Sequence, residues 1–208
     1  MVAKGQAKDA YGGNAPRAAR MKKMIYDCSI EESAMRHAKR CVFAHSPAHT
    51  RENLGENLYY TSDLRLDKIQ AAEQNYALQQ TEAFRELKLG LMSSLSTELD
   101  SRMFSQNSFG ADLTLKSDIT LRQGNSFTTF SLNEFDGDCF EMVWQDTYKL
   151  GCHVEWCSSM TYVVCQYGPK GNWLGNIVYE IGNSCATDDD CKCENCKCSK
   201  EEALCIVQ

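Results

Sequence analysis

Apolar side chains recur at helical spacing in the first part of the chain. Between Ile30 and Cys41 they return every three or four positions. The preceding Ser29 stands three residues before Glu32, which is the spacing of a capping box. This pattern predicts a helix from about Ser29 to Arg40.

A second amphipathic stretch runs from Asp67 to Leu89 and predicts the longest helix of the chain. Its apolar side chains share one side: Ile69, Ala72, Tyr76, Ala83 and Leu87.

Helical periodicity is weak in residues 91–136, which are rich in Ser, Thr, Asn and Asp. We expect a long polar segment there, with one strand at residues 112–121.

Alternation typical of strands follows, at residues 141–145, 151–157 and 161–167. The last two are separated by Ser158, Ser159 and Met160, a hairpin loop in length and chemistry. Helices first and antiparallel strands last predict an α+β sandwich.

Half of the chain's 12 cysteines lie in its last two dozen residues: Cys185, Cys191, Cys193, Cys196, Cys198 and Cys205. A segment this short buries too little apolar surface to fold without covalent staples, and disulfides require an oxidising compartment. A thiolate metal cluster is the alternative, but the zinc-ribbon arrangement of two separated C-x-x-C pairs is missing. The tail therefore predicts a secreted protein.

The other cysteines are spread through the body as disulfide partners would be: Cys28, Cys41, Cys139, Cys152, Cys157 and Cys165. An even total is consistent with complete pairing, although the connectivity is not determined by the sequence. Cys157 and Cys165 flank the predicted hairpin loop, so we expect them to pair first.

A net charge of -6 and a pI of about 5.3 argue against nucleic-acid binding, which needs clustered Lys and Arg. No segment approaches the ~20 apolar residues of a membrane span. The first residues, Met1-Val-Ala-Lys, lack the apolar core of a signal peptide. For a secreted protein, this predicts an N-terminally truncated sequence or a mature fragment with an added initiator Met; a copy that has lost secretion is the third alternative, and the cysteine usage favours the first two.

Four motifs resemble those of the CAP superfamily, which includes cysteine-rich secretory proteins, antigen 5 and plant pathogenesis-related proteins. They are Cys41-Val-Phe-Ala-His-Ser46, Asn53-Leu-Gly-Glu-Asn-Leu58, Gly137-Asp-Cys-Phe-Glu-Met-Val-Trp144 and the run from Val163 to Trp173. The start of the chain and its Cys-rich tail are most similar to activation-associated secreted proteins of parasitic nematodes. The resemblance implies a three-layer α-β-α sandwich over residues 1–173, with an atypical segment at 91–136 and most of the first helix missing. Residues 174–208 would form a hinge-like, disulfide-stapled extension.

The resemblance also implies a central cleft with two His and two acidic residues, which binds zinc in some members. Carried over to this sequence, the set is His45, Glu56, Glu86 and Asp138, with Asp138 in place of the second His. We expect weak or absent metal binding, carried by His45 and Glu56, because a more anionic set is less selective for zinc. Each residue also has a purely structural alternative to a role in the cleft. His45 could be a buried histidine bonded to a backbone carbonyl, Glu56 could hold its own loop, and Glu86 could be an exposed helix residue.

These observations predict a secreted, non-enzymatic CAP-domain protein of a parasitic nematode that acts at the host interface by binding a host protein or lipid. Two alternatives stay open: a metal-dependent cleft hydrolase using His45 and Glu56, and a sterol or lipid carrier. We assign no catalytic residue and no cofactor beyond a weak divalent metal, and the sequence does not determine the oligomeric state.

Overall fold

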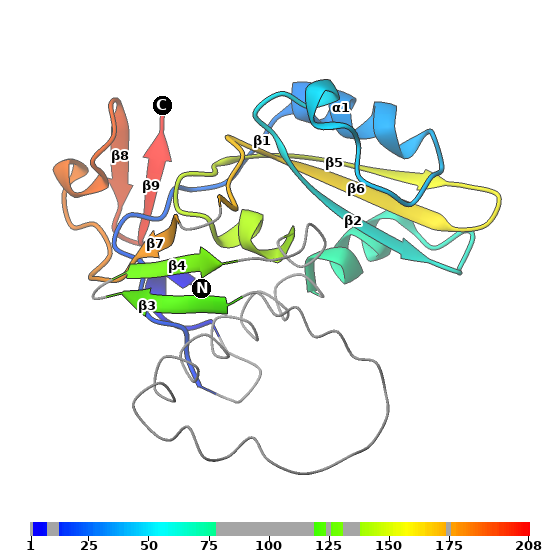
Figure 1. Ribbon diagram of the computed structural model, residues 1–208. Helices are drawn as coiled ribbons and strands as arrows, with labels where there is room; N and C mark the ends of the chain where they lie inside the picture. The colour runs from blue at the N-terminus through cyan, green and yellow to red at the C-terminus, as the bar shows by residue number, and fades with distance from the viewer. Residues whose placement is uncertain (1, 8–12, 78–118, 124–125, 131–137, 174–175) are drawn as a thin grey trace, which may run out of the picture.

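The computed structural model of the chain describes residues 2–7, 13–77, 119–123, 126–130, 138–173 and 176–208 (Figure 1). Within this part, no helix is both long enough and apolar enough to cross a bilayer.

A mixed four-stranded sheet forms the centre of the molecule, with the strand order β1-β5-β6-β2. The strands are β1 (Ile25–Tyr26), β5 (Lys149–Trp156), β6 (Thr161–Gly168) and β2 (Gly55–Thr61). β1 pairs parallel to β5, and the other two pairings are antiparallel. The hairpin predicted around residues 158–160 is therefore present.

Helices cover both faces of this sheet (Figure 1). Every residue of β6 is buried, and its side chains alternate between the faces. Tyr162 and Val164 pack beneath α1 (Cys28–Ala38), whereas Val163 and Cys165 pack with Ala71 on the opposite face. The α+β class predicted from the order of elements is confirmed.

Asp27, one residue before α1, caps this helix. Its Oδ1 accepts hydrogen bonds from the backbone N–H groups of Ser29 and Ile30, at 3.0 and 3.4 Å. The hydroxyl of Ser29 and the ammonium of Lys149 hold the pKa of Asp27 well below its usual range. The predicted cap at Ser29 was wrong, because the Asp27 carboxylate already satisfies the first amides of the helix.

Residues 68–77 are helical, and Asp67 accepts hydrogen bonds from the amides of Ile69 and Gln70. On the apolar side of this stretch, Ile69 is 70% exposed and Tyr76 55%, whereas Ala72 packs partly buried against the core. The fully buried Ala71 faces β6 instead, since a small side chain allows the helix to lie close to the sheet. The remainder of the predicted helix, including Ala83 and Leu87, lies outside the described residues.

Residues 138–143 form a 3₁₀ helix, η3 (Asp138–Val143), and not the predicted strand. Contacts with a residue distant in the sequence, Gly171, explain the difference. Glu141 is buried and accepts a hydrogen bond from the amide of Gly171 at 2.8 Å, and the ring of Trp144 covers Gly171.

A second sheet combines β3 (Ile119–Gln123), β4 (Ser126–Phe130) and β7 (Ile177–Glu180). The strand predicted at residues 112–121 overlaps β3, and its first part lies outside the described residues, as does most of the segment 91–136. In β7, Val178 and Tyr179 are buried in a cluster with small N-terminal side chains: Ala3, Ala7, Ala15 and Ala18. The short 3₁₀ helix η1 (Val2–Lys4) belongs to this cluster.

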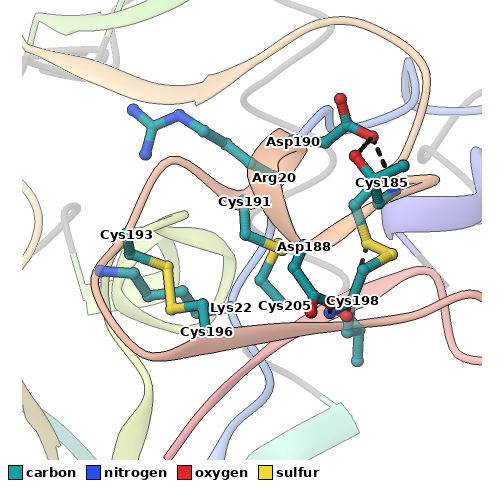
Figure 2. The surroundings of a disulfide bond; sticks show 12 residues. Arg20, Lys22, Cys185, Asp188, Asp190, Cys191, Cys193, Cys196, Cys198 and Cys205 are labelled. Carbon is teal, nitrogen blue, oxygen red and sulfur yellow. Dashed lines mark hydrogen bonds between the residues drawn. A yellow bond between two sulfur atoms is a disulfide. The ribbon is translucent and has the colours of Figure 1, made fainter.

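The Cys-rich tail contains the 3₁₀ helix η4 (Asp188–Cys191) and the hairpin of β8 (Cys196–Ser199) with β9 (Leu204–Val207). Three disulfides staple it: Cys185–Cys198, Cys191–Cys205 and Cys193–Cys196 (Figure 2). The expected covalent staples are therefore seen in the structure.

Main-chain hydrogen bonds attach the tail to the body. The amide of Cys205 donates to the carbonyl of Met21, and the amide of Lys23 donates to the carbonyl of Cys205, each at 2.8 Å. Lys23 also forms a 2.7 Å ion pair with Glu202. The tail thus lies against residues 21–23.

The body contains the disulfides Cys41–Cys157 and Cys152–Cys165. The pairing expected between Cys157 and Cys165 was wrong, because Cys152 and Cys165 are direct register partners on neighbouring strands. The expected disulfide role of Cys28 was also wrong: its thiol is exposed and unpaired at the start of α1. The side chain of Cys139 lies outside the described residues.

Candidate functional site

The predicted site centres on Glu56, the second residue of β2. Glu56 lies opposite Gln166 in the register of β2 and β6. Because neighbouring residues of a strand point to opposite faces, Glu56 shares the α1 face with Leu58 and Gln166. Sheet alternation therefore places a carboxylate beneath the chain that follows α1.

That chain folds back over β2 and brings His45 and Ser46 to the carboxylate. The disulfide of Cys41 with Cys157 fixes its start, and the 3₁₀ helix η2 (Ala48–Thr50) turns it. Arg51 closes the loop by donating from Nη1 to the carbonyl of Leu54 at 2.6 Å.

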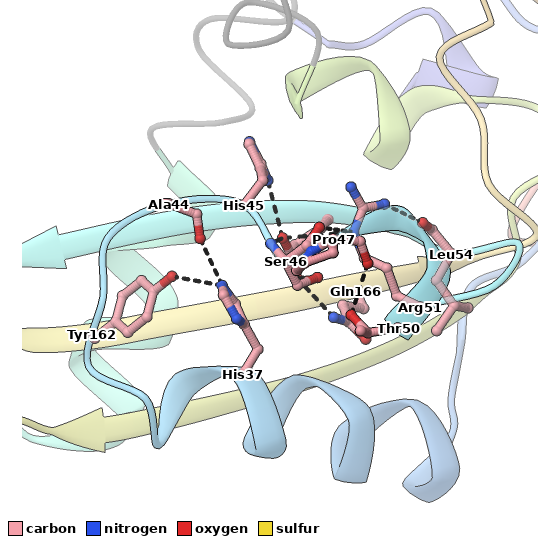
Figure 3. Close-up of polar contacts among 11 residues, drawn as sticks. His37, Ala44, His45, Ser46, Pro47, Thr50, Arg51, Leu54, Tyr162 and Gln166 are labelled. Carbon is pink, nitrogen blue, oxygen red and sulfur yellow. Dashed lines mark hydrogen bonds and ion pairs between the residues drawn. The ribbon is translucent and has the colours of Figure 1, made fainter.

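Both carboxylate oxygens of Glu56 are occupied by hydrogen-bond donors (Figure 3). Oε1 accepts from the Ser46 amide at 2.7 Å and from His45 Nδ1 at 3.0 Å. Oε2 accepts from the Ser46 hydroxyl at 2.6 Å and from Gln166 Nε2 at 2.8 Å. Arg51 Nε lies 3.7 Å from Oε1 and adds a positive charge.

These contacts decide the protonation of Glu56, which is only 3% exposed. Burial by itself raises the pKa of a carboxyl group. Here the hydrogen bonds from His45, Ser46 and Gln166 outweigh burial and lower the pKa of Glu56 to about 2. The group is therefore an ionised carboxylate at neutral pH.

The arrangement limits the chemistry of Glu56. A carboxylate with every lone-pair direction used by fixed donors is poorly placed to accept a proton from a substrate or to bind a metal directly. It fixes the ring of His45 through Nδ1 instead, as a carboxylate does for a metal-binding histidine. The loop-holding role weighed for Glu56 is thus visible in its contacts.

The described residues supply one imidazole, His45, to a zinc site of the kind the resemblance implies. Glu86 lies outside the described residues, and so does the side chain of Asp138. The sole group of three closely spaced potential ligands found in the described part of the chain is Cys185, Cys191 and Cys205. These cysteines are all in disulfides, so they do not form a thiolate metal site. We therefore derive no step through a metal.

Sequence reasoning missed three residues that hold the site together: Ser46 through its backbone amide and its hydroxyl, Gln166 through its side-chain amide, and Arg51 through its guanidinium. Ser46 and Gln166 lie within motifs already noted, but only the register of β2 with β6 shows that they meet Glu56.

The model of the CAP family, described as "Cysteine-rich secretory protein family", matches residues 14–167, which is most of the chain. The chain belongs to the CAP family. The Ancylostoma secreted protein of Ancylostoma caninum is 39% identical over 98% of this chain, and hookworm platelet inhibitor 1 of the same species is 26% identical over 84%. The chain spans 40% of the first relative and 64% of the second.

Solved CAP structures agree with this assignment. NaASP2, crystallised with Zn²⁺, is 43% identical with a TM-score of 0.66, and the match covers 98% of this chain and 86% of that one. Na-ASP-1 is 38% identical with a TM-score of 0.69, and the match covers 98% of this chain and 43% of that one. The chain is therefore a homologue of hookworm secreted CAP proteins, and its disulfides are consistent with secretion.

Proposed function

We propose that this chain is a secreted, non-enzymatic CAP protein of a parasitic nematode that acts by binding a host protein. The observation that carries the proposal is the occupied carboxylate of Glu56. A cleft hydrolase would need this group as a base or as a metal ligand, yet its oxygens hold the loop of His45 and Ser46 in place.

A relative supports the host-binding part of the proposal. Hookworm platelet inhibitor 1 is named for an effect on a host cell, and its sequence aligns with 84% of this chain. Function within one fold differs between members, so the target of the present chain is a separate question. We infer a host protein as the class of partner.

One cavity among the described residues, of 490 Å³, fits this class of partner better than a lipid, because its lining includes the charged groups of Asp27, Arg51 and Lys149. A lipid or sterol carrier needs an apolar cavity instead.

The test compares the unmodified protein with His45→Ala. This change removes the imidazole and leaves the Ser46 and Gln166 hydrogen bonds to Glu56, so the fold is retained. We expect both proteins to bind the same host serum or platelet-surface protein with equal affinity, and neither to hydrolyse peptides or esters. Turnover that disappears in His45→Ala would overturn the proposal in favour of the hydrolase. Selective retention of sterol or fatty acid, without protein binding, would favour the carrier.

A further inference from the structure

One disulfide of the tail differs from its neighbours in the size of the loop that it closes. Cys193 and Cys196, which form what we call the C-x-x-C disulfide, are three positions apart. The other two tail disulfides join cysteines that are 13 and 14 positions apart. A cross-link stabilises the folded state by restricting the unfolded chain, and this contribution grows with loop length. The C-x-x-C disulfide therefore contributes least to folding among the three.

The framework of the tail does not depend on the C-x-x-C disulfide. Cys185–Cys198 and Cys191–Cys205 hold η4 and the β8–β9 hairpin together. The sulfur atoms of Cys185, Cys191 and Cys205 lie within 4.8 Å of one another, so these two bonds are close together in the interior of the tail. Reduction of the C-x-x-C disulfide leaves both of them closed.

The C-x-x-C disulfide lies beside a cavity at the surface of the tail. This cavity, of 710 Å³, is lined by both of its cysteines. Cys193 is partly exposed, whereas Cys196 begins β8 opposite Val207 and is only 6% exposed. Figure 2 shows the bond on one side of the other two tail disulfides. A thiolate in the cavity can therefore reach Cys193, while Cys196 lies on the inner side of the bond.

The lining of this cavity favours a polar thiol. Apart from the two cysteines, all lining residues have charged or amide side chains, and they include two lysines next to the cysteines in sequence, Lys192 and Lys197, and two acids, Asp188 and Glu194. A lining with both signs of charge suits the amino and carboxylate groups of a peptide thiol. At about 30 Å³ per water molecule, the cavity has room for roughly 20 waters, which is enough for a short peptide.

We propose that the C-x-x-C disulfide is a thiol-oxidising site for peptide or protein thiols. The substrate thiolate attacks Cys193 Sγ and forms a mixed disulfide, and the original S–S bond breaks with its electron pair on Cys196 Sγ, which takes up a proton. A second substrate thiolate attacks the substrate sulfur of the mixed disulfide and releases Cys193 as a thiolate, which is also protonated. Two thiols are thereby oxidised to one disulfide, and the C-x-x-C disulfide is reduced to a dithiol. This activity goes beyond the proposed binding function and does not depend on it.

The first test counts the disulfides that glutathione opens in the unmodified protein. The exposed thiol of Cys28 is first blocked with N-ethylmaleimide. Millimolar glutathione is kept reduced by glutathione reductase, so each protein disulfide that opens consumes one NADPH. We expect one equivalent per chain in a phase at least tenfold faster than any further reduction, because exposed disulfides are the labile ones.

The cysteines opened in this fast phase are located by alkylation in acid-quenched samples and peptide mass spectrometry. The label should appear on Cys193 and Cys196. Absence of a fast phase would overturn the proposal. A fast phase that maps to Cys41–Cys157, or to any other pair, would overturn it as well.

Serine variants test which sulfur is attacked. Cys196→Ser leaves a free thiol at the cavity, on Cys193, whereas Cys193→Ser leaves one on the inner side, on Cys196. With oxidised glutathione as the probe, the mixed disulfide should form at least fivefold faster in Cys196→Ser, since its thiol is the accessible one. Equal rates would overturn the assignment of Cys193 as the attacked sulfur.

The double variant Cys193→Ser/Cys196→Ser separates a thiol-oxidising role from a structural one. It keeps the two disulfides that hold η4 and the β8–β9 hairpin. We expect it to lose the fast phase and to keep its melting temperature within about 5 °C of the unmodified protein. An unfolded double variant would show that the bond is required for the fold, and a retained fast phase would place the reduction elsewhere; either result would overturn the proposal.

Discussion

Gly151 of β5 lies directly beneath Glu31 of α1, and a Cβ at position 151 would overlap the backbone nitrogen of Glu31. The glycine therefore sets how closely the helix approaches the sheet. The overlap involves backbone of a helix and not the flexible end of a side chain, so it cannot be relieved by a rotamer change.

Gly151→Ala should lower the free energy of unfolding by about 3 kcal/mol, since α1 must move off the sheet. Denaturant unfolding measures the effect. Gly168→Ala is the control, because its added methyl would meet the side-chain ends of Leu54 and Ile30 and would lie at ordinary contact distance from Lys149 Cβ. We expect a loss of about 1 kcal/mol or less there. Similar losses in both variants would contradict the close approach.

Glu56 should make the fold sensitive to acid. Its pKa is lowered from 4.5 to about 2 in the folded protein, so its contribution is complete above pH 4.5 and is lost as the pH falls toward 2. The shift corresponds to at most about 3 kcal/mol. The difference in unfolding free energy between the unmodified protein and Glu56→Gln should therefore fall by about half between pH 7 and pH 3.

Glu52→Gln serves as the control for that series, because Glu52 is an exposed acid in the same loop. Its effect on stability should be small at both pH values. A pH-independent gap between Glu56→Gln and the unmodified protein would mean that Glu56 is not held ionised by its neighbours.

Zinc affinity should be weak in the unmodified protein and should increase at least tenfold in Asp138→His. The substitution adds a neutral imidazole and removes one negative charge from an acidic set. Calorimetric titration with zinc is the measurement, and adding His45→Ala should abolish the gain. Unchanged affinity would show that position 138 does not converge with His45.

Cys28 should react with a thiol reagent in the native, unreduced protein, because it is exposed and unpaired at the start of α1. Cys28→Ser should lower the titrated count by one. The six tail cysteines should stay unreactive until a reductant is added. A native count that is the same in Cys28→Ser would place this cysteine in a disulfide.

The sequence predicted those elements whose burial follows a regular pattern of apolar residues along the chain. The β5–β6 hairpin and α1 appear near their expected positions, because alternation and helical periodicity report burial directly. The strand expected at residues 141–145 is a 3₁₀ helix up to Val143 in the structure. The carboxylate of Glu141 and the ring of Trp144 contact Gly171, which is distant in the sequence, so a local pattern could not reveal it. The packing of residues 68–77 could not be predicted for a similar reason. Ala71 packs against β6 because its small side chain allows a close approach, whereas the larger Ile69 is exposed.

The candidate site was predicted in part. The two motifs around His45 and Glu56 indicated that these residues meet, and their atoms lie 3.0 Å apart. The role of Glu56 could not be derived, because it depends on how many donors surround the carboxylate. Those donors come from Ser46 and Gln166, on elements far apart in sequence. The contributions of Glu86 and Asp138 stay predictions.

The main-chain attachment of the tail has a consequence for how its surface can change. The bonds that join Cys205 to Met21 and Lys23 use backbone atoms, whose geometry does not depend on the identity of outward-facing side chains. Among the exposed residues of the tail, Asp188 and Asp190 accept hydrogen bonds from tail amides and Glu202 pairs with Lys23, so these three are tied to folding. With the disulfides fixing the interior, exposed residues without such bonds can change in charge and size more freely. The tail is therefore a surface on which substitutions can accumulate with little loss of stability.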